Sequence, residues 1–258
     1  MYNQSNIYKG IFKNASLCFL ASICFIVVFA QNEIEIPAPL HHEQIVHHAG
    51  YTFSYNESYE QANWVAYELT APETVALFKR NNRFSIDPKV TTGTADQTDY
   101  AHSGYDRGHL APAADMAWSE QSMRESFYYS NMSPQAPSFN RGVWKRLEEF
   151  VRAKAINHEA LYVVTGPVLM PGLPSIGPHH VSVPAFFYKV LLDYTHSPVI
   201  GIGFIVPNKG SNLPLEGYAV SIDEVEQLTG IDFFPSLPDT IEEAVERHLD
   251  VTQWFNNE

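Results

Sequence analysis

Hydrophobic and polar residues alternate, or form short apolar runs, at intervals along the chain after about residue 45. The segment Tyr51–Tyr55 alternates aromatic and polar side chains, which is typical of a half-buried strand. Runs rich in β-branched and aromatic residues predict further strands, and glycine, proline or asparagine closes some of them. These runs occupy residues 64–69, 160–164, 185–192 and 199–206.

Four segments are predicted to be helical, and most of them begin at a recognisable cap. Ser119 is a good N-cap for a helix over residues 120–127. Apolar residues recur at helical spacing over residues 140–155, where they would form one buried face. Two capping boxes, at residues 221–224 and 240–243, open further helices that extend to about residues 229 and 251.

The order of these elements favours one α+β domain over residues 49–255. Pro134 and Pro137 exclude residues 132–139 from regular structure, because proline cannot donate a backbone hydrogen bond. No internal repeat and no long linker divides the pattern. Strands separated by irregular segments, with helices inserted between them, fit a single α+β unit better than two domains.

The first thirty residues differ from the rest of the chain. Lys9 and Lys13 precede an uncharged apolar run, and small residues stand just before Gln31. This order predicts a secretory signal peptide over residues 1–30, and therefore a secreted or periplasmic protein with no stable membrane association after cleavage. An uncleaved membrane anchor is the alternative, although the run is short for a spanning helix.

Residues 31–48 contain prolines and acidic residues and predict an extended N-terminal arm. Four histidines in the arm could bind a metal, but they lack periodic spacing on a helix, so an exposed segment is the prediction. They are His41, His42, His47 and His48. Both cysteines lie in the first thirty residues, so the remaining chain could form no disulfide and use no thiolate.

The chain is acidic, with 16 basic and 29 acidic residues and a formal net charge of −13. Proteins that bind nucleic acids usually carry a basic surface. Residues 79–154 nevertheless contain 11 basic and 9 acidic residues, so the positive charge gathers in one part of the chain. A phosphate ligand would bind there, and a metal ion would have to supply much of the positive charge.

One short motif, Asp106-Arg107-Gly108-His109, sets an acid, a guanidinium and an imidazole almost side by side. The planar donors of an arginine fit phosphate oxygens, and a histidine can take a proton from water near neutral pH. The same residues allow a plainer interpretation. In that interpretation Asp106 and Arg107 form a surface ion pair, and His109 is a core residue.

Two later segments, residues 130–135 and 140–148, complete an ordered set with this motif. The set resembles the DNA/RNA non-specific endonucleases of the ββα-metal superfamily, and the resemblance extends over most of the chain after residue 45. The combination is specific, whereas no single piece of it is. It implies an α+β fold in which helices flank a central antiparallel sheet.

The resemblance implies the chemistry of three residues. His109 would be the general base, and Asn140 would be the protein ligand of one Mg²⁺, with Mn²⁺ as the alternative ion. Glu148 would orient metal-bound water. Each has a plainer alternative, because asparagine is a common helix N-cap and Glu148 could be a solvated charge beside Glu149.

Four further residues are candidates for the site by the same resemblance. Arg107 would contact the scissile phosphate, and Asn131 would support the catalytic residues by hydrogen bonding unless it is only a turn residue. Arg83 is a weaker candidate for phosphate contact, because Arg80 competes for that role.

The expected partners are DNA and RNA, cleaved with little sequence preference. Nothing in the pattern is an evident reader of a DNA groove. Two other functions stay open. The chain could be a non-catalytic nucleic-acid-binding module on the same scaffold, or a hydrolase of small phosphodiesters.

Overall fold

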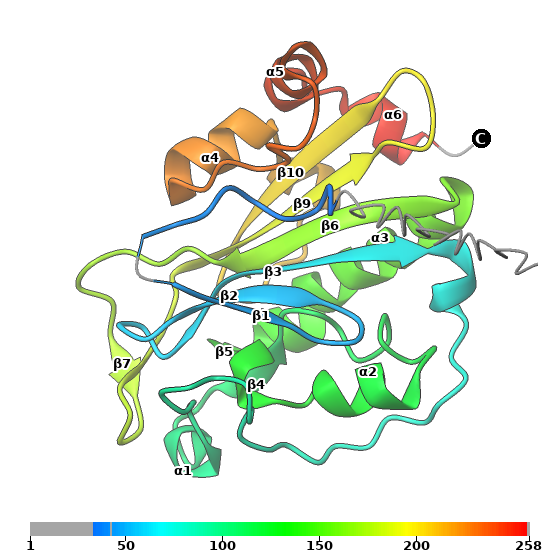
Figure 1. The fold of residues 1–258 in the computed structure, drawn as a ribbon. Helices are drawn as coiled ribbons and strands as arrows, with labels where there is room; N and C mark the ends of the chain where they lie inside the picture. Colours follow the sequence, from blue (N-terminus) through cyan, green and yellow to red (C-terminus); the bar gives the residue numbers. More distant parts are fainter. Residues whose placement is uncertain (1–32, 42, 257–258) are drawn as a thin grey trace, which may run out of the picture. The chain divides into compact units, whose positions relative to one another are not determined.

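A seven-stranded antiparallel sheet organises the residues that the structure describes, 33–41 and 43–256 of a computed structural model (Figure 1). The strand order is β1-β2-β3-β6-β9-β10-β11. The strands are β1 (Gln44–His47), β2 (Thr52–Asn56), β3 (Gln61–Thr70), β6 (Ala160–Pro167), β9 (Phe186–Asp193), β10 (Ile200–Pro207) and β11 (Ala219–Val220). Four predicted sheet strands therefore correspond to β3, β6, β9 and β10, and the strand predicted near residue 51 corresponds to β2.

Helices and two small hairpins surround this sheet. The hairpins are β4 (Asp106–His109) with β5 (Met132–Gln135), and β7 (Ser175–Ile176) with β8 (Val181–Ser182). The α-helices are α1 (Gln97–Tyr100), α2 (Glu120–Glu125), α3 (Lys145–Asn157), α4 (Ile222–Thr229), α5 (Asp239–Arg247) and α6 (Val251–Phe255). Shorter helical turns are η1 (Ala71–Thr74), η2 (Tyr129–Asn131), η3 (Phe139–Trp144) and η4 (Leu215–Tyr218).

Alternate residues of the central strands enter two different cores, because side chains of a strand point to opposite faces of the sheet. On β3, Val65 and Tyr67 join a core that includes Leu147 of α3. Trp64 and Ala66 join a second core, which includes side chains of α4 and α5. Figure 1 shows α3 and the β4–β5 hairpin on one side of the sheet, and α4 and α5 on the other. The predicted α+β class is confirmed.

The β4–β5 hairpin followed by η3 and α3 forms the ββα unit of the fold. The prediction that residues 132–139 lie outside regular structure is wrong for β5. Pro134 stands opposite Arg107 in an isolated two-stranded ladder. A proline is tolerated there because each strand of such a ladder has an outer edge that needs no partner.

The helix predicted over residues 140–155 is present but does not begin as a regular α-helix. Its first part, η3, has π-helical hydrogen bonding and is joined to α3 across a kink at Gly142, where φ is −112° and ψ is −107°. Ser119 caps α2 as predicted, by accepting a hydrogen bond from the backbone of Ser122. The kink separates the polar start of this segment, at Asn140, from the regular helix that packs in the core.

The C-terminal capping predictions have different outcomes. Ser221 and Glu224 form the predicted capping box at the start of α4. The box predicted at residues 240–243 is wrong, because α5 begins directly after Pro238 and has no side-chain cap. The predicted helix is also interrupted, since α5 ends at Arg247 and a separate helix, α6, follows. Pro238 occupies the N-cap position with an extended backbone, so the helix has already begun before Thr240 and that side chain cannot cap it.

The predicted arm over residues 31–48 is wrong at its C-terminal end. Gln44–His47 is strand β1, which pairs antiparallel with β2 at the edge of the sheet. The next side chain, His48, is buried and lies 2.7 Å from a carboxylate oxygen of Asp87. The sequence did not show that this histidine has a distant acidic partner. The predicted signal peptide lies outside the described residues, and within them no helix has the length and apolarity of a bilayer span.

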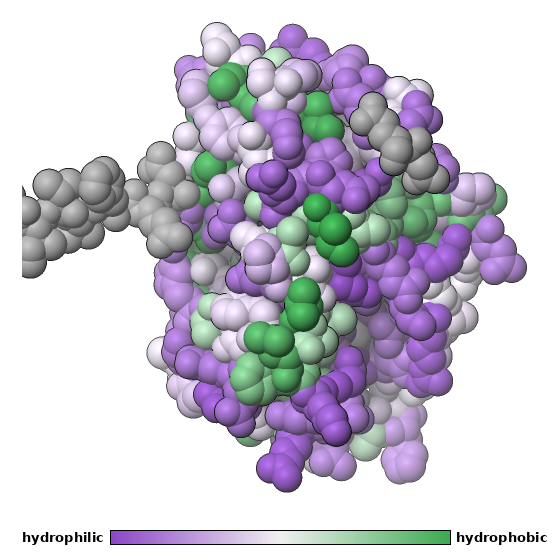
Figure 2. Space-filling view, turned by 90° about the vertical axis from the view of Figure 1, so that its right-hand side faces the viewer, coloured by the Kyte–Doolittle hydropathy of each residue, from purple (hydrophilic) through white to green (hydrophobic). Residues whose placement is uncertain are grey.

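A small apolar patch lies on the face that Figure 2 shows, among mainly hydrophilic residues. Val75, Leu77 and Phe78 follow η1 in the chain and are exposed large apolar residues. The backbone here is fixed, because the N–H groups of Leu77 and Phe78 both donate to the carbonyl oxygen of Ala117 at 2.9 Å. This anchored segment leads directly to Arg80.

The two caps yield a matched stability test. We expect Ser221→Ala to lower the free energy of unfolding by about 1 kcal/mol, because it removes the side-chain acceptor at the start of α4. Thr240→Ala should change it by less than about 0.5 kcal/mol, because Thr240 caps nothing. Urea denaturation followed by circular dichroism measures both. Equal losses in the two variants would contradict this assignment of the caps.

Candidate active site

His109 ends strand β4 and is almost completely buried, with 8% of its surface exposed. Its ring meets Phe127 edge to face, with the centroids 4.8 Å apart. Nε2 is buried and has no hydrogen-bond partner among the described residues. Burial and the positive charges of Arg80 and Arg107 lower the pKa of His109 to about 3. The imidazole is therefore neutral at pH 7, which is the form that can accept a proton.

Asn131 fixes the backbone that follows His109. Its side chain accepts a hydrogen bond from Ala111 N at 2.8 Å and donates to the Ala111 carbonyl at 2.9 Å. It also donates to the carbonyl of Ser126 at 2.8 Å. Asn131 is completely buried and is not among the residues that line the cavity described below. Asn131 therefore holds the backbone at Ala111, two residues after His109, from outside the cavity.

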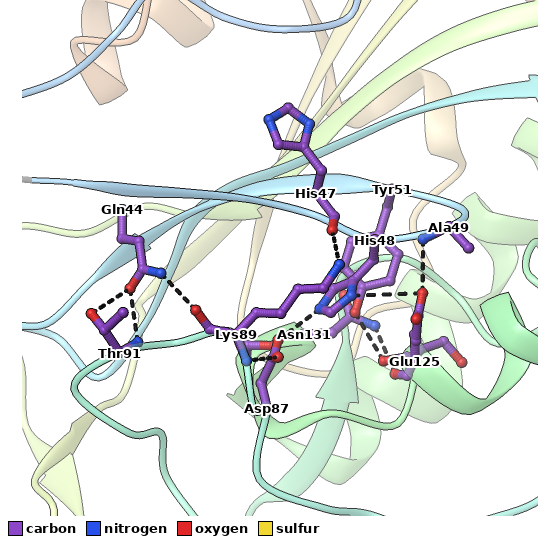
Figure 3. A network of polar contacts seen from close by, with 12 residues as sticks. Gln44, His47, His48, Ala49, Tyr51, Asp87, Lys89, Thr91, Glu125 and Asn131 are labelled. Carbon is purple, nitrogen blue, oxygen red and sulfur yellow. Dashed lines mark hydrogen bonds and ion pairs between the residues drawn. The ribbon is translucent and has the colours of Figure 1, made fainter.

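A second buried network lies beside this support (Figure 3). His48 Nε2 lies 2.7 Å from Asp87 Oδ2, and Ser130 Oγ donates to the same oxygen at 2.6 Å. Glu125 accepts a hydrogen bond from Ala49 N at 2.7 Å. The network thus connects the end of β1 to the segment that carries Asn131. Sequence reasoning missed these residues, because the Asp87-Pro88 turn gave no sign of a partner 39 residues away.

Asp106 orients Asn140. The carboxylate accepts a hydrogen bond from Asn140 Nδ2 at 2.9 Å, and it accepts two from Arg141, from Nε at 2.9 Å and from a terminal nitrogen at 2.6 Å. The plainer interpretation of the motif, an ion pair between Asp106 and Arg107, is therefore wrong. The hydrogen bond fixes the orientation of the amide, and among the described residues no donor is hydrogen-bonded to Asn140 Oδ1.

Arginine side chains lie against aromatic rings near His109. The guanidinium carbon of Arg107 is 4.0 Å from the centroid of Phe84, and that of Arg80 is 4.9 Å from the centroid of Phe127. Stacking of this kind holds a guanidinium in place while its donors stay available.

His109, Asn140, Arg80 and Arg107 line a cavity of about 440 Å³. Its lining consists of Arg80, Arg107, His109, Pro112, Ala113, Ala114, Asn140, Arg141, Lys145, Glu148 and Arg152. The basic side chains outnumber the single acid, so the predicted gathering of positive charge is confirmed at this place. Arg83 is exposed and does not line the cavity, whereas its competitor Arg80 does. A larger hollow of about 690 Å³ beside α6 contains none of the predicted site residues.

A group of buried charges lies behind Glu148. Asp115 is paired with Arg152 at 2.7 Å and accepts a hydrogen bond from Tyr67 at 2.8 Å. Lys189 on β9 is completely buried, and its Nζ has no hydrogen-bond partner among the described residues. Burial raises the pKa of Glu148 and lowers that of Lys189, while the attraction between the two opposes both shifts. Glu148 is therefore not the solvated surface charge of the plainer interpretation.

The residues of the cavity fit a hard divalent cation held mainly by oxygen and water. The free Oδ1 of Asn140 is a neutral oxygen donor of the kind that Mg²⁺ and Mn²⁺ accept. Among the described residues, every cluster of three histidine or acidic ligands lies elsewhere. A cation in this cavity would depend on Asn140 and on solvent for its first ligands.

The arrangement defines a class of protein: an α+β nuclease with a ββα unit, whose histidine and asparagine face one basic cavity. The family model described as DNA/RNA non-specific endonuclease matches residues 33–240. The chain therefore belongs to the DNA/RNA non-specific endonuclease family, and the predicted resemblance is confirmed. It is a non-specific endonuclease of this family, and therefore a hydrolase.

Relatives from several groups of organisms share this similarity. The chain is 34% identical over 212 residues to mitochondrial endonuclease G of Bos taurus, covering 75% of this chain and 70% of the relative. It is 35% identical over 212 residues to a nuclease of a Nostoc species, covering 78% and 76%. A crystal structure titled as an EndoG/EndoGI complex matches with a TM-score of 0.71 and 30% identity, covering 79% of this chain and 89% of that chain.

The relatives correct the predicted location. The endonuclease G relative and a 35% identical zebrafish (Danio rerio) relative, nuclease EXOG, covering 74% of this chain and 60% of that relative, are both named as mitochondrial proteins. The prediction of a secreted or periplasmic protein is therefore wrong. A basic start followed by apolar residues is not specific for secretion, because positive charge is a feature of several kinds of targeting segment.

The two histidines with opposite pKa shifts predict a measurable difference. His109 should stay neutral at pH 5, whereas His179, whose pKa is raised by its hydrogen bond to Asp99, should gain its proton above pH 6.5. NMR titration of histidine-labelled protein measures both, with His109→Ala and His179→Ala assigning the signals. The pKa of His109 is about 3 in the folded protein and about 6.5 in the unfolded chain. Protonation therefore favours the unfolded chain, and the free energy of unfolding decreases as the pH falls from about 6.5 towards 3. A His109 signal that titrates near pH 6.5 would contradict the burial.

Proposed function

We propose that this chain hydrolyses phosphodiester bonds of DNA and RNA with the help of one Mg²⁺ bound through Asn140, with Mn²⁺ as an alternative ion. One observation supports the proposal above all others. A neutral His109, a free amide oxygen on Asn140 and the two ring-stacked arginines, Arg80 and Arg107, line the same cavity.

His109 acts as the general base in this proposal. Because Nε2 is buried, Nδ1 is the ring nitrogen that can take a proton from water in the cavity. The low pKa keeps the nitrogen unprotonated at neutral pH. The same shift limits its strength as a base, so a bound phosphate must raise it. A phosphate provides that change, because its negative charge offsets the arginines that lower the pKa.

Asn140 and the arginines bind the substrate and its charge. A divalent cation would offset the negative charge that develops on the phosphorus centre. Asp106 holds the Asn140 amide so that its oxygen is available to such a cation. Arg107 and Arg80 donate to phosphate oxygens, and Glu148 orients water at the back of the cavity. Asn131 positions His109 through Ala111 and takes no direct part in the chemistry.

Binding through the phosphate groups of the substrate explains why the enzyme should have little preference for nucleotide sequence. Cavity residues that are basic recognise the backbone, which is the same at every step of a nucleic acid. The surrounding protein is acidic, with a net charge of −13, so substrate is held mainly at this one place. Binding should therefore weaken as the salt concentration rises.

His109→Ala is the direct test of the general base. With supercoiled plasmid and with RNA in Mg²⁺, we expect its cleavage rate to fall roughly 10²–10⁴-fold relative to wild type. EDTA should stop cleavage by the wild-type enzyme. His179→Ala is the control, because His179 lies away from the cavity and should keep the wild-type rate. Full activity of His109→Ala would refute the base, and binding without any cleavage would favour a non-catalytic module.

Arg80 and Arg83 form a matched pair for the phosphate contact. Arg80→Ala should raise KM several-fold and reduce the slope of log KM against log salt by about one, since one phosphate contact is lost. Arg83→Ala should change neither quantity, because Arg83 does not line the cavity. Steady-state kinetics at several salt concentrations on a short duplex measure both variants. An effect of Arg83→Ala alone would reverse the assignment.

A further inference from the structure

Five carboxylates gather between α4 and α5, on the other side of the sheet from the candidate active site. They are Asp223, Glu226, Asp232, Glu242 and Glu246. Two triads share Glu246: in one its carboxylate oxygen lies with those of Asp223 and Glu226, and in the other with those of Asp232 and Glu242. Within each triad the oxygens all lie within 4.8 Å of one another.

Glu246 is the centre of this cluster and is buried. Only 7% of its surface is exposed, and its Oε1 has no hydrogen-bond partner among the described residues. It belongs to both triads, so the unpartnered side chain is directed into the cluster and not towards solvent. A buried carboxylate oxygen without a partner costs free energy and indicates that something else satisfies it.

No basic side chain in the described part of the chain forms an ion pair with these carboxylates. The backbone N–H of Phe233 donates to Glu226 at 2.8 Å. Burial and the neighbouring acids raise the pKa of Glu246 to about 8 and that of Glu226 to about 7. The repulsion is relieved either by retained protons or by a bound cation.

We propose that this cluster binds Ca²⁺, with Glu246 as the central ligand and its four neighbours completing the oxygen shell. Ca²⁺ takes six to eight oxygen ligands in flexible geometry, which suits several carboxylates from three segments of chain. Mg²⁺ demands a small octahedral shell and keeps its waters, so it fits a crowded carboxylate cluster less well.

The site would join two helices that have few other polar links. Asp223 and Glu226 belong to α4, Glu242 and Glu246 belong to α5, and Asp232 lies in the connection between them. Val225 and Val245 of the same helices pack in the second core. A bound Ca²⁺ therefore stabilises the packing of α4 and α5 against the sheet, and it does so independently of nucleic-acid cleavage.

Thermal unfolding of the full chain tests this site. The Asn140→Ala background removes the proposed active-site ligand, so a cation effect there does not come from the nuclease cavity. After EDTA treatment and dialysis, we expect added Ca²⁺ to raise Tm by a few degrees in a concentration-dependent way, and Mg²⁺ to raise it less. Isothermal titration calorimetry with CaCl₂ should show binding in the same protein.

Single substitutions on α5 locate the effect. Glu246→Gln should abolish the Ca²⁺-dependent rise in Tm and the heat of binding. Glu243→Gln is the matched control, since Glu243 is exposed on the same helix and belongs to neither triad, and it should keep both. If Glu246→Gln fails to fold, Glu242→Gln replaces it and should weaken Ca²⁺ binding at least several-fold. No Ca²⁺ effect in the Asn140→Ala protein, or an unchanged effect in the cluster variants, overturns the proposal.

Discussion

The hydrogen bonds of the Asp106 carboxylate join the two parts of the candidate active site. Asp106 begins the strand that carries His109, and it holds Asn140 and Arg141 at the start of the following helix, 34 and 35 residues later. Apolar packing of Leu147 and Val151 holds the helix in the core, and Asp106 adds a polar link between the hairpin and the start of that helix. Because one charged group accepts all three hydrogen bonds, the imidazole and the amide oxygen open onto the same cavity.

The electrostatics of the site depend on its position in the fold. The chain is strongly acidic, yet five arginine and lysine side chains and only one acid line the cavity. Glu148 and Arg152 of the cavity wall lie close to the buried Asp115 and Lys189, so each charge depends on its neighbours. A protein with a negative net charge can still attract phosphate at a positively charged cavity, because salt screens the acidic residues that lie far from it.

Local patterns predicted much of the fold, and they failed where packing decided the outcome. The capping box at Ser221 is present because its residues contact only one another. The similar pattern at Thr240 forms no cap, because Pro238 starts the helix first. Pro134 was taken to prevent a strand, yet β5 tolerates it in a two-stranded ladder. The error at Thr240 comes from a proline just before the pattern, whereas the error at β5 comes from the partner strand β4, which the pattern does not contain.

The sequence by itself pointed to His109 and Asn140, through the resemblance of their motifs to a family, and its local patterns predicted the central strands β3, β6, β9 and β10 and the helix that follows Asn140. Periodicity is a property of short segments, so these elements can be read directly, whereas strands β4 and β5 were not predicted. Only the tertiary structure decided that Asp106 pairs with Arg141, that Arg80 lines the cavity and Arg83 does not, and that Glu246 is buried among acids. These facts depend on contacts between segments distant in sequence, which leave no local signal.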